Sequence, residues 1–139
     1  MYEQLLKRLD SAPSAEKIKL MDEVKKYISE PAVVDKICTL LVEDEDRFVR
    51  IKATELLEEV NGNERVVSAL IKALREDEDA FVRGFSAKAL GRVGTPAAIQ
   101  PLEEAVNDPD GFVRDFAAGS LKVLQMRARL LGMIKKKDS

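Results

Sequence analysis

The chain has 139 residues and a formal net charge of −2, and its 45% hydrophobic and 35% charged residues are typical of a globular protein. It contains no histidine and no tryptophan, and its one cysteine is Cys38. These counts exclude Ser-His-Asp and Cys-His nucleophile systems, zinc sites that need histidine or several cysteines, and an intrachain disulfide. We therefore expect a protein that is not an enzyme, with no catalytic residues, no metal and no other cofactor.

The charge is distributed unevenly along the chain. Residues 1–111 carry 16 basic and 23 acidic side chains, whereas residues 112–139 carry seven basic and two acidic ones. The acidic balance over most of the length argues against a general nucleic-acid binder. The first ten residues are charged where a signal peptide would be apolar, and no stretch reaches the ~18 apolar residues of a membrane span. We expect a cytoplasmic protein.

The N-terminal thirty residues predict a short helix at 2–9, a proline-containing turn at 11–14 and a second helix at 15–29. They lack the motif that recurs further along the chain. A terminal repeat meets water on its outer face, so we interpret residues 1–30 as a degenerate capping repeat. It belongs to one solenoid domain that spans residues 1–139.

The rest of the chain is dominated by an internal repeat. The tripeptide Phe-Val-Arg begins at Phe48, Phe81 and Phe112, with offsets of 33 and 31 residues, and an Asp precedes each Phe by two positions. Apolar residues recur at helical spacing on both sides of each acidic turn, which predicts two helices per unit. The predicted repeats cover residues 31–61, 62–94 and 95–125.

Each predicted turn carries its own capping signals. The acidic turns lie at residues 43–46, 76–79 and 107–110. We expect the last residue of each turn to cap the following helix: Asp46, Asp79 and Asp110. We also expect the turns to be solvated, because they lack the ligand spacing of a calcium loop. Between units, Asn61-Gly62 and Gly94 predict breaks, and Thr95-Pro96 predicts a cap and a first helical position.

The C-terminal segment predicts one long final helix from Phe112 to Lys137, with residues 126–139 as its end and basic tail. Apolar residues alternate there with arginines and lysines. One interpretation is a capping helix that closes the last repeat. The other is an amphipathic basic helix that contacts an anionic membrane, RNA or an acidic partner.

The repeats resemble a known family in the segment around Val82-Arg83, Ser86-Ala87 and Ala89-Leu90-Gly91. This pattern is similar to the HEAT-like repeat of the phycobilisome-lyase group, and Pro101 is typical of the family's first helix. The resemblance implies an all-α fold, an α-α superhelix or short HEAT-like solenoid of about four helical hairpins. It also implies that the second helices line the concave side and that the module binds proteins. The histidine-dependent iron hydroxylases of this family are excluded, because the chain has no histidine.

The five phenylalanines occupy only two repeat-equivalent positions. Stacked units would align them along the second helices, where they either anchor a partner or pack between units as core. The candidate partner-binding residues on this face are Phe48, Ile51, Lys52, Glu55, Phe81, Phe85, Lys88, Phe112 and Phe116.

The recurring arginines Arg50, Arg83 and Arg114 have two interpretations. They either form a row that binds phosphate or carboxylate ligands, or they pair with the acidic turns in an Arg–Asp ladder that joins the units. We favour the ladder, because acidic residues recur at the same period. Cys38 lies beside Ile37 on an apolar helix face, which predicts a buried structural thiol.

These observations favour a non-catalytic scaffold that binds another protein or peptide through the concave face of the second helices. One alternative is a bilin-lyase-like subunit, or a chaperone, that acts on a chromophore-bearing protein. Another is weak binding of nucleic acid or a membrane surface through the basic C-terminal helix. A further alternative is a homodimer, in which exposed aromatic side chains pair two copies of the chain.

Overall fold

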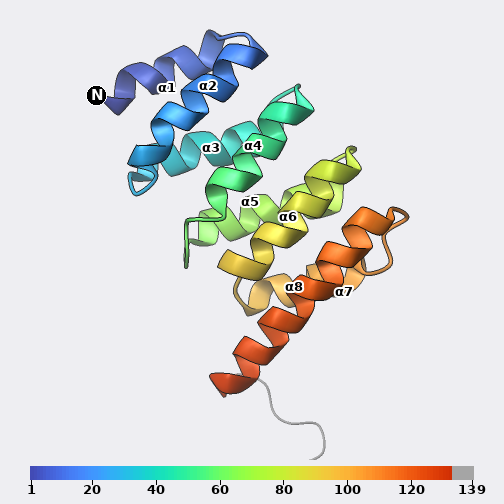
Figure 1. Ribbon diagram of the computed structural model, residues 1–139. Helices are drawn as coiled ribbons and strands as arrows, with labels where there is room; N and C mark the ends of the chain where they lie inside the picture. Colours follow the sequence, from blue (N-terminus) through green and yellow to red (C-terminus); the bar gives the residue numbers. More distant parts are fainter. Residues whose placement is uncertain (133–139) are drawn as a thin grey trace, which may run out of the picture.

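The computed structural model describes residues 1–132, and these residues form eight α-helices, two 3-10 turns and no strand. The α-helices span α1 Tyr2–Ser11, α2 Ser14–Val24, α3 Pro31–Glu43, α4 Arg47–Leu57, α5 Glu64–Glu76, α6 Ala80–Val93, α7 Ile99–Ala105 and α8 Gly111–Leu130. Consecutive helices pair as hairpins, with α1, α3, α5 and α7 in one row and α2, α4, α6 and α8 in the other (Figure 1). This confirms the predicted all-α solenoid of helical hairpins.

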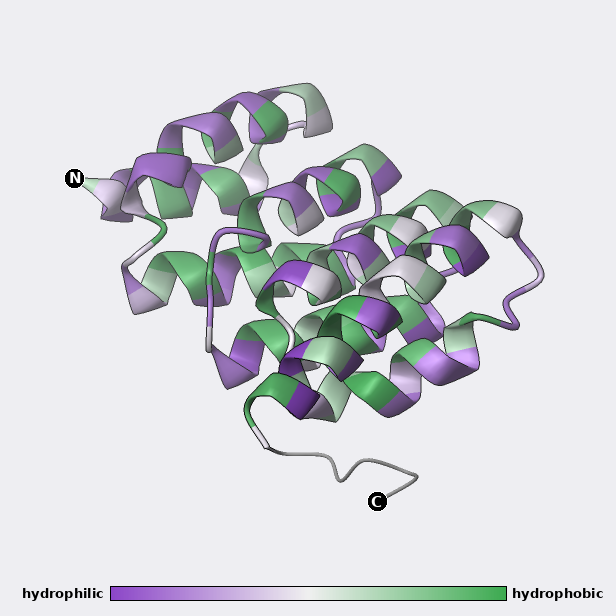
Figure 2. Cartoon of the chain, turned by 60° about the horizontal axis from the view of Figure 1, so that its bottom comes forward, coloured by the Kyte–Doolittle hydropathy of each residue, from purple (hydrophilic) through white to green (hydrophobic). Residues whose placement is uncertain are grey.

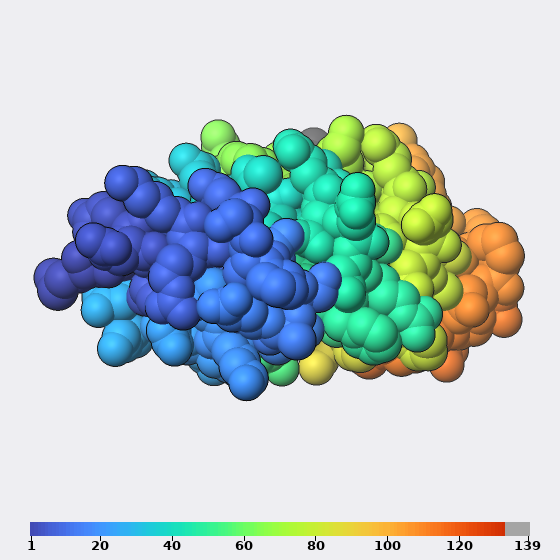
Figure 3. Space-filling view, turned by 90° about the horizontal axis from the view of Figure 1, so that it is seen from above, coloured from blue at the N-terminus to red at the C-terminus, as the bar shows by residue number. Residues whose placement is uncertain are grey.

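The hairpins follow one another in chain order along the long axis of the molecule (Figure 3). Contacts run both within a hairpin and between neighbours: α6, for example, packs against α5 of its own hairpin and against α4 and α8 on either side. Stability in such an array is approximately a sum of unit and nearest-neighbour terms. No helix within residues 1–132 is both long enough and apolar enough to cross a membrane.

The core lies between the two rows of helices, because each helix is apolar on one face (Figure 2). Most of the predicted apolar positions are buried: Val34, Ile37, Cys38 and Leu41 on α3, Val49, Ala53 and Leu57 on α4, Val67, Leu70 and Leu74 on α5, Val82, Leu90 and Val93 on α6, Leu102 on α7, and Val113, Ala117 and Leu124 on α8. The others are half-buried and pack against the core: Val60, Ile71, Ile99, Val106 and Leu121. Burial of each large aliphatic side chain contributes roughly 1.5–3 kcal/mol.

Three predicted helix ends differ from the structure. The first helix runs to Ser11 instead of residue 9. The second helix ends at Val24 and closes with a 3-10 turn at Lys25–Tyr27, instead of continuing to residue 29. Pro31 opens α3 and disfavours a helical conformation at Glu30, which is extended, so the helix has to end earlier. The last helix ends at Leu130, where Gly132 has a left-handed φ of 71°. The predicted continuation and the basic tail, residues 133–139, lie outside the described residues.

The start of α7 also differs from the prediction. Thr95 makes no side-chain cap, and Pro96–Ala98 form a 3-10 turn before α7 begins at Ile99. Pro101 explains the late start. A proline has no N–H to donate and fits only the first turn of an α-helix, and the bounds of α7 place Pro101 there.

The two glycine breaks between units work in different ways. Gly62 has a φ of +66°, the left-handed conformation that favours glycine. Gly94 is extended at φ −71° and ψ 158°. Any Cβ at Gly94 would overlap the carbonyl oxygen of Leu90, so this position needs the space that a glycine leaves rather than its conformational freedom.

Candidate protein-interaction surface

The acidic turns between the helices of a hairpin share one hydrogen-bond pattern. The first Asp of each turn accepts, at 2.9 Å, the backbone N–H of the second Asp two residues later, and this second Asp, the last residue of the turn, caps the following helix. The capping carboxylates accept the backbone N–H of Phe48, Phe81 and Phe112 at 2.7–2.8 Å. This confirms the three predicted N-caps. Each aromatic residue is therefore the second residue of a helix whose start is fixed by a carboxylate.

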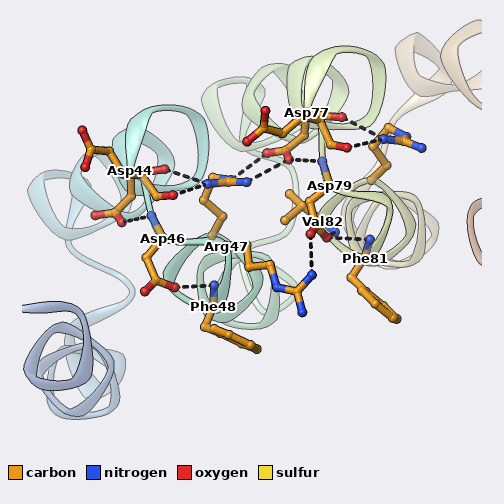
Figure 4. A network of polar contacts seen from close by, with 12 residues as sticks. Asp44, Asp46, Arg47, Phe48, Asp77, Asp79, Phe81 and Val82 are labelled. Carbon is orange, nitrogen blue, oxygen red and sulfur yellow. Dashed lines mark hydrogen bonds and ion pairs between the residues drawn. The ribbon is translucent and has the colours of Figure 1, made fainter.

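The Arg–Asp ladder is confirmed between neighbouring units (Figure 4). Nε and Nη2 of Arg50 donate to the two carboxylate oxygens of Asp77 at 2.8 and 3.1 Å, while Nη1 donates to the backbone carbonyls of Asp44 and Glu45. The Arg50 and Asp77 side chains are each only 8% exposed. The prediction that these turns are solvated is therefore wrong for the first Asp, which the arginine of the preceding unit covers.

The ladder repeats once more and then changes at both ends. Arg83 makes the same fork with Asp108, at 3.0 and 3.1 Å. Arg114 donates through Nη1 to two backbone carbonyls of its own turn at 2.8 Å, but it has no carboxylate partner within residues 1–132. At the N-terminal end, Lys17 takes the place of the missing arginine and contacts Asp44 at 2.6 Å. The first hairpin is thus joined to the array by an ion pair to the same turn position.

The electrostatics of these turns favour the charged carboxylates. Burial alone would raise the pKa of Asp108, but the hydrogen bonds from Arg83 and from the backbone N–H of Asp110 outweigh it and lower the pKa. Burial likewise opposes the hydrogen bonds from Arg47 and the backbone of α6, which leave the pKa of Asp79 below its ordinary value. Both aspartates are therefore ionised at neutral pH and remain so into mildly acidic solution.

The five phenylalanines form an aromatic row on the second helices. Phe48 and Phe81 are 57% and 46% exposed, whereas Phe85, Phe112 and Phe116 are half-buried. Ring centroids lie 5.1 Å apart for Phe81–Phe112 and for Phe112–Phe116, and 5.2 Å apart for Phe85–Phe112, all edge to face. Phe112 also packs directly on the backbone of α6, because a Cβ on Gly84 would overlap its ring. The row therefore combines a packed part between α6 and α8 with an exposed part on α4 and α6.

Arg47 links the two exposed rings (Figure 4). Its guanidinium carbon lies 5.0 Å from the centroid of Phe48 and 5.8 Å from that of Phe81, and Nη1 donates to Asp79 at 2.9 Å. A guanidinium at these distances is attracted by an aromatic ring. Arg47 thus holds two exposed aromatic side chains of neighbouring units in a fixed relation.

The remaining predicted partner-binding residues lie in different environments. Ile51 is half-buried and packs against the core. Lys52 is half-buried and contacts Asp22 at 2.6 Å and Glu55 at 2.8 Å, and these hydrogen bonds raise its pKa. Glu55 and Lys88 are exposed. Exposure alone therefore makes Glu55, Lys88, Phe48 and Phe81 more accessible than Ile51.

Sequence reasoning missed several residues of this surface. It identified the capping Asp of each turn but not the first Asp, two residues earlier, which receives the arginine. The signal was present, since all three turns read Asp-x-Asp: Asp44–Asp46, Asp77–Asp79 and Asp108–Asp110. Arg47 and Lys17 carried no signal, because neither residue recurs in the other units.

Cys38 is buried, as predicted. Burial raises the pKa of its thiol to about 11, with smaller opposing effects of Arg65, which lowers it, and Asp35, which raises it. A thiol with this pKa is almost entirely protonated at neutral pH and is a poor nucleophile. Within residues 1–132 no three His, Cys, Asp or Glu side chains are grouped so that they could hold a metal ion.

Comparison with known proteins places these helices in a family. The profile of HEAT repeats matches residues 2–84 and 34–122. A stretch of 39 residues is 54% identical to the phycocyanobilin lyase subunit alpha of Picosynechococcus sp., which is 28% of this chain and 15% of the relative. Both matches agree with the resemblance to HEAT-like repeats of the phycobilisome-lyase group. The chain covers only a small part of the lyase subunit's length.

Proposed function

Because the chain belongs to the HEAT-repeat family, we propose that it is a non-catalytic scaffold that binds a partner protein or peptide through the exposed face of its second helices. HEAT repeats commonly mediate protein interactions, and the array offers a preorganised surface rather than a reactive group. The aromatic row is the observation that carries the proposal.

Exposed phenylalanines are the reason for choosing this face. Phe48 and Phe81 expose about half of their surface, whereas the next residue in each helix, Val49 and Val82, is fully buried. Aromatic side chains contribute large contact areas at interfaces and lose little conformational entropy there. The Arg47 guanidinium lies over both rings, and the ring of Phe112 packs against Phe81, so these contacts restrict the movement of the exposed rings before a partner binds.

The similarity to the lyase subunit supports a shared repeat unit rather than shared chemistry. The matched stretch of 39 residues is only slightly longer than one repeat period of 33 or 31 residues. A match of that length gives a bilin-lyase function no support beyond the fold. Binding of a bilin would be visible directly as a change in its absorbance spectrum on mixing with the protein.

Site-specific photo-crosslinking tests the proposal. A photoreactive phenylalanine analogue at position 81 is expected to crosslink to a partner in native lysate, and the double substitution Phe48→Ser and Arg47→Ser is expected to abolish that product. The matched control carries the analogue at Lys72, an exposed residue of α5 in the other row. Equal crosslinking from positions 81 and 72 would show that the second-helix face has no special role.

A further inference from the structure

A hollow of about 500 Å³ lies on the second-helix row, between α6 and α8 and next to the turn at Asn61. Lys88 and Arg92 of α6 line it from one side, and Phe116, Val123 and Arg127 of α8 line it from the other. The two helices lie side by side (Figure 1), and side chains of both line the hollow.

The basic side chains that line this hollow have few acidic partners. It contains three basic side chains and one acidic side chain, Asp115. Arg92 and Arg127 make no ion pair with a carboxylate among residues 1–132, and Lys88 lies 3.8 Å from Glu58, a long contact. Arg50 and Arg83 of the ladder are different, because each of them pairs with an Asp at about 3 Å.

Arg127 is positioned rather than neutralised. Its Nη1 and Nη2 lie 3.4 Å from the backbone carbonyls of Gly94 and Gly91, at the C-terminal end of α6. These hydrogen bonds are long and their acceptors are uncharged. They place the guanidinium beside the hollow but leave its positive charge without a counter-ion. A carboxylate of a binding partner would supply the counter-ion that Arg127 lacks among residues 1–132.

The floor of the hollow contains a glycine that packing does not require. Gly119 lies in the middle of the 20-residue helix α8, where a glycine costs about 1 kcal/mol relative to alanine. A Cβ at this position would meet no atom within 4 Å. Its missing side chain therefore serves no contact within residues 1–132, and a large side chain at this lining position would take up space in the hollow.

Apolar side chains continue from the hollow along the same face of α8. Val123 lines the hollow and is 47% exposed, and Met126 and Leu130 follow at 64% and 81% exposure, at a spacing of three and four residues. A ligand that fills the hollow would therefore meet positive charge from both helices and apolar surface from α8.

We infer that this hollow binds an acidic segment of the partner protein, with carboxylates at Arg92 and Arg127 and an apolar side chain against Phe116 and Val123. The inference rests on the proposed scaffold function and names the partner's chemistry. A long polyanion such as RNA fits less well, because residues 1–111 carry 23 acidic against 16 basic side chains and would repel it beyond the hollow.

A binding assay with a defined probe tests this inference. The probe is a fluorescein-labelled 12-residue peptide in which Glu and Leu alternate with Ser, and its fluorescence anisotropy is followed as the full chain is added. Three comparison probes are the same peptide with Lys in place of Glu, with Ser in place of Leu, and a 12-nucleotide single-stranded RNA. The acidic apolar peptide is expected to bind at least tenfold more tightly than each of them.

Matched variants separate the hollow from the general charge of α8. Arg92→Glu with Arg127→Glu is expected to weaken binding at least tenfold. The control, Lys122→Glu with Arg129→Glu, makes the same charge change at two exposed residues that do not line the hollow, and it is expected to weaken binding less than threefold. Gly119→Trp should block binding, while Gly119→Ala should retain it, and neither introduces a Cβ clash.

Several results would overturn the inference: no binding of the acidic peptide, equal losses in the two double variants, or tighter binding of the RNA through the same residues. The crosslinking at position 81 reads the scaffold function separately. If the wild type gives that product but does not bind the acidic peptide, the scaffold proposal stands and the acidic-partner inference fails. If the product is absent from the wild type, the scaffold proposal itself fails.

Discussion

Replacing Arg83 with alanine should uncouple the last hairpin from the rest of the array. Its guanidinium makes two hydrogen bonds to Asp108, at 3.0 and 3.1 Å, and two to the carbonyls of Asp77 and Glu78, at 2.9 and 3.2 Å. The substitution therefore removes a fork that joins α6 to the α7–α8 turn. It also leaves the Asp108 carboxylate, whose side chain is only 11% exposed, with fewer donors.

The size of the effect follows from these contacts. Hydrogen bonds to charged groups contribute roughly 1.5–3 kcal/mol, and the Arg83 and Asp108 side chains are largely shielded from water. We expect Arg83→Ala to lower the free energy of unfolding by about 2–3 kcal/mol, toward the lower end of what breaking a buried pair costs. For a chain of this length that corresponds to a fall in Tm of roughly 10 °C.

Arg114→Ala is the matched control. Arg114 occupies the equivalent position one repeat later and makes the same two bonds to backbone carbonyls, but no carboxylate within residues 1–132 closes its fork. Its side chain is exposed, so we expect a loss of less than about 1 kcal/mol. The two variants remove the same side chain, and the difference between them isolates the carboxylate contact.

Urea unfolding followed by circular dichroism measures both free energies, and hydrogen exchange locates the effect. In Arg83→Ala the amides of α7 and α8 should exchange faster, while those of α3 and α4 should change little, because units in a solenoid are coupled mainly to their neighbours. Equal losses of stability in Arg83→Ala and Arg114→Ala would refute the reasoning. A uniform increase in exchange across all helices would refute the locality of the coupling.

Three further predictions follow from the same contacts. The hydrogen-bonded carboxylates of Asp79 and Asp108 have lowered pKa values, so the stability they contribute is present above pH ~4, near the ordinary Asp pKa, and is lost as the pH falls through their folded-state pKa values. The urea concentration at the midpoint of unfolding, measured from pH 7 down to pH 2, should therefore decrease at acid pH. A midpoint that does not change with pH would contradict the assignment. Gly84→Ala should destabilise the protein by about 1–3 kcal/mol, because the added Cβ would overlap the Phe112 ring. Gly119→Ala should stabilise it by about 0.5–1 kcal/mol, because the added Cβ meets no other atom. Tm values that shift in the same direction in both variants would contradict this packing. The thiol of Cys38, with a pKa of about 11, should react with Ellman's reagent at pH 8 only upon unfolding, and rapid labelling of the folded protein would contradict its burial.

The sequence was sufficient for the repeat, because its signals are redundant. Each unit carries apolar residues at helical spacing, an acidic turn and a capping Asp, and all of these agree with one another. The helix ends were less predictable. Pro31 and Pro101 each place a helix boundary where the apolar pattern does not predict it. A proline restricts the conformation of its neighbours sterically, and the spacing of apolar residues carries no information on that effect.

The surface was predicted only in part, because exposure depends on which side chains neighbouring units bring together. Phe48, Phe81 and Phe112 are equivalent in sequence, yet Phe112 is half-buried and the other two are exposed. The difference arises at Gly84, which lets Phe112 approach the backbone of α6. At the position equivalent to Gly84, α4 carries Ile51, whose side chain does not leave the same space for Phe81. A motif repeated three times therefore gives three different environments.

The ladder and the aromatic row share residues, and this sharing constrains how the surface can change. Asp79 caps α6 just before Phe81 and also accepts Nη1 of Arg47, whose guanidinium lies over Phe48 and Phe81. One carboxylate thus fixes the start of a helix, the link to the preceding unit and the position of two exposed rings. If this face binds a partner as proposed, a change at Asp79 would disturb stability and binding together, whereas a change at the exposed ring of Phe48 would act mainly on binding. Preorganisation of the surface is therefore a consequence of how the units are joined, and substitutions that separate the two properties have to be made at the rings and not at the turns.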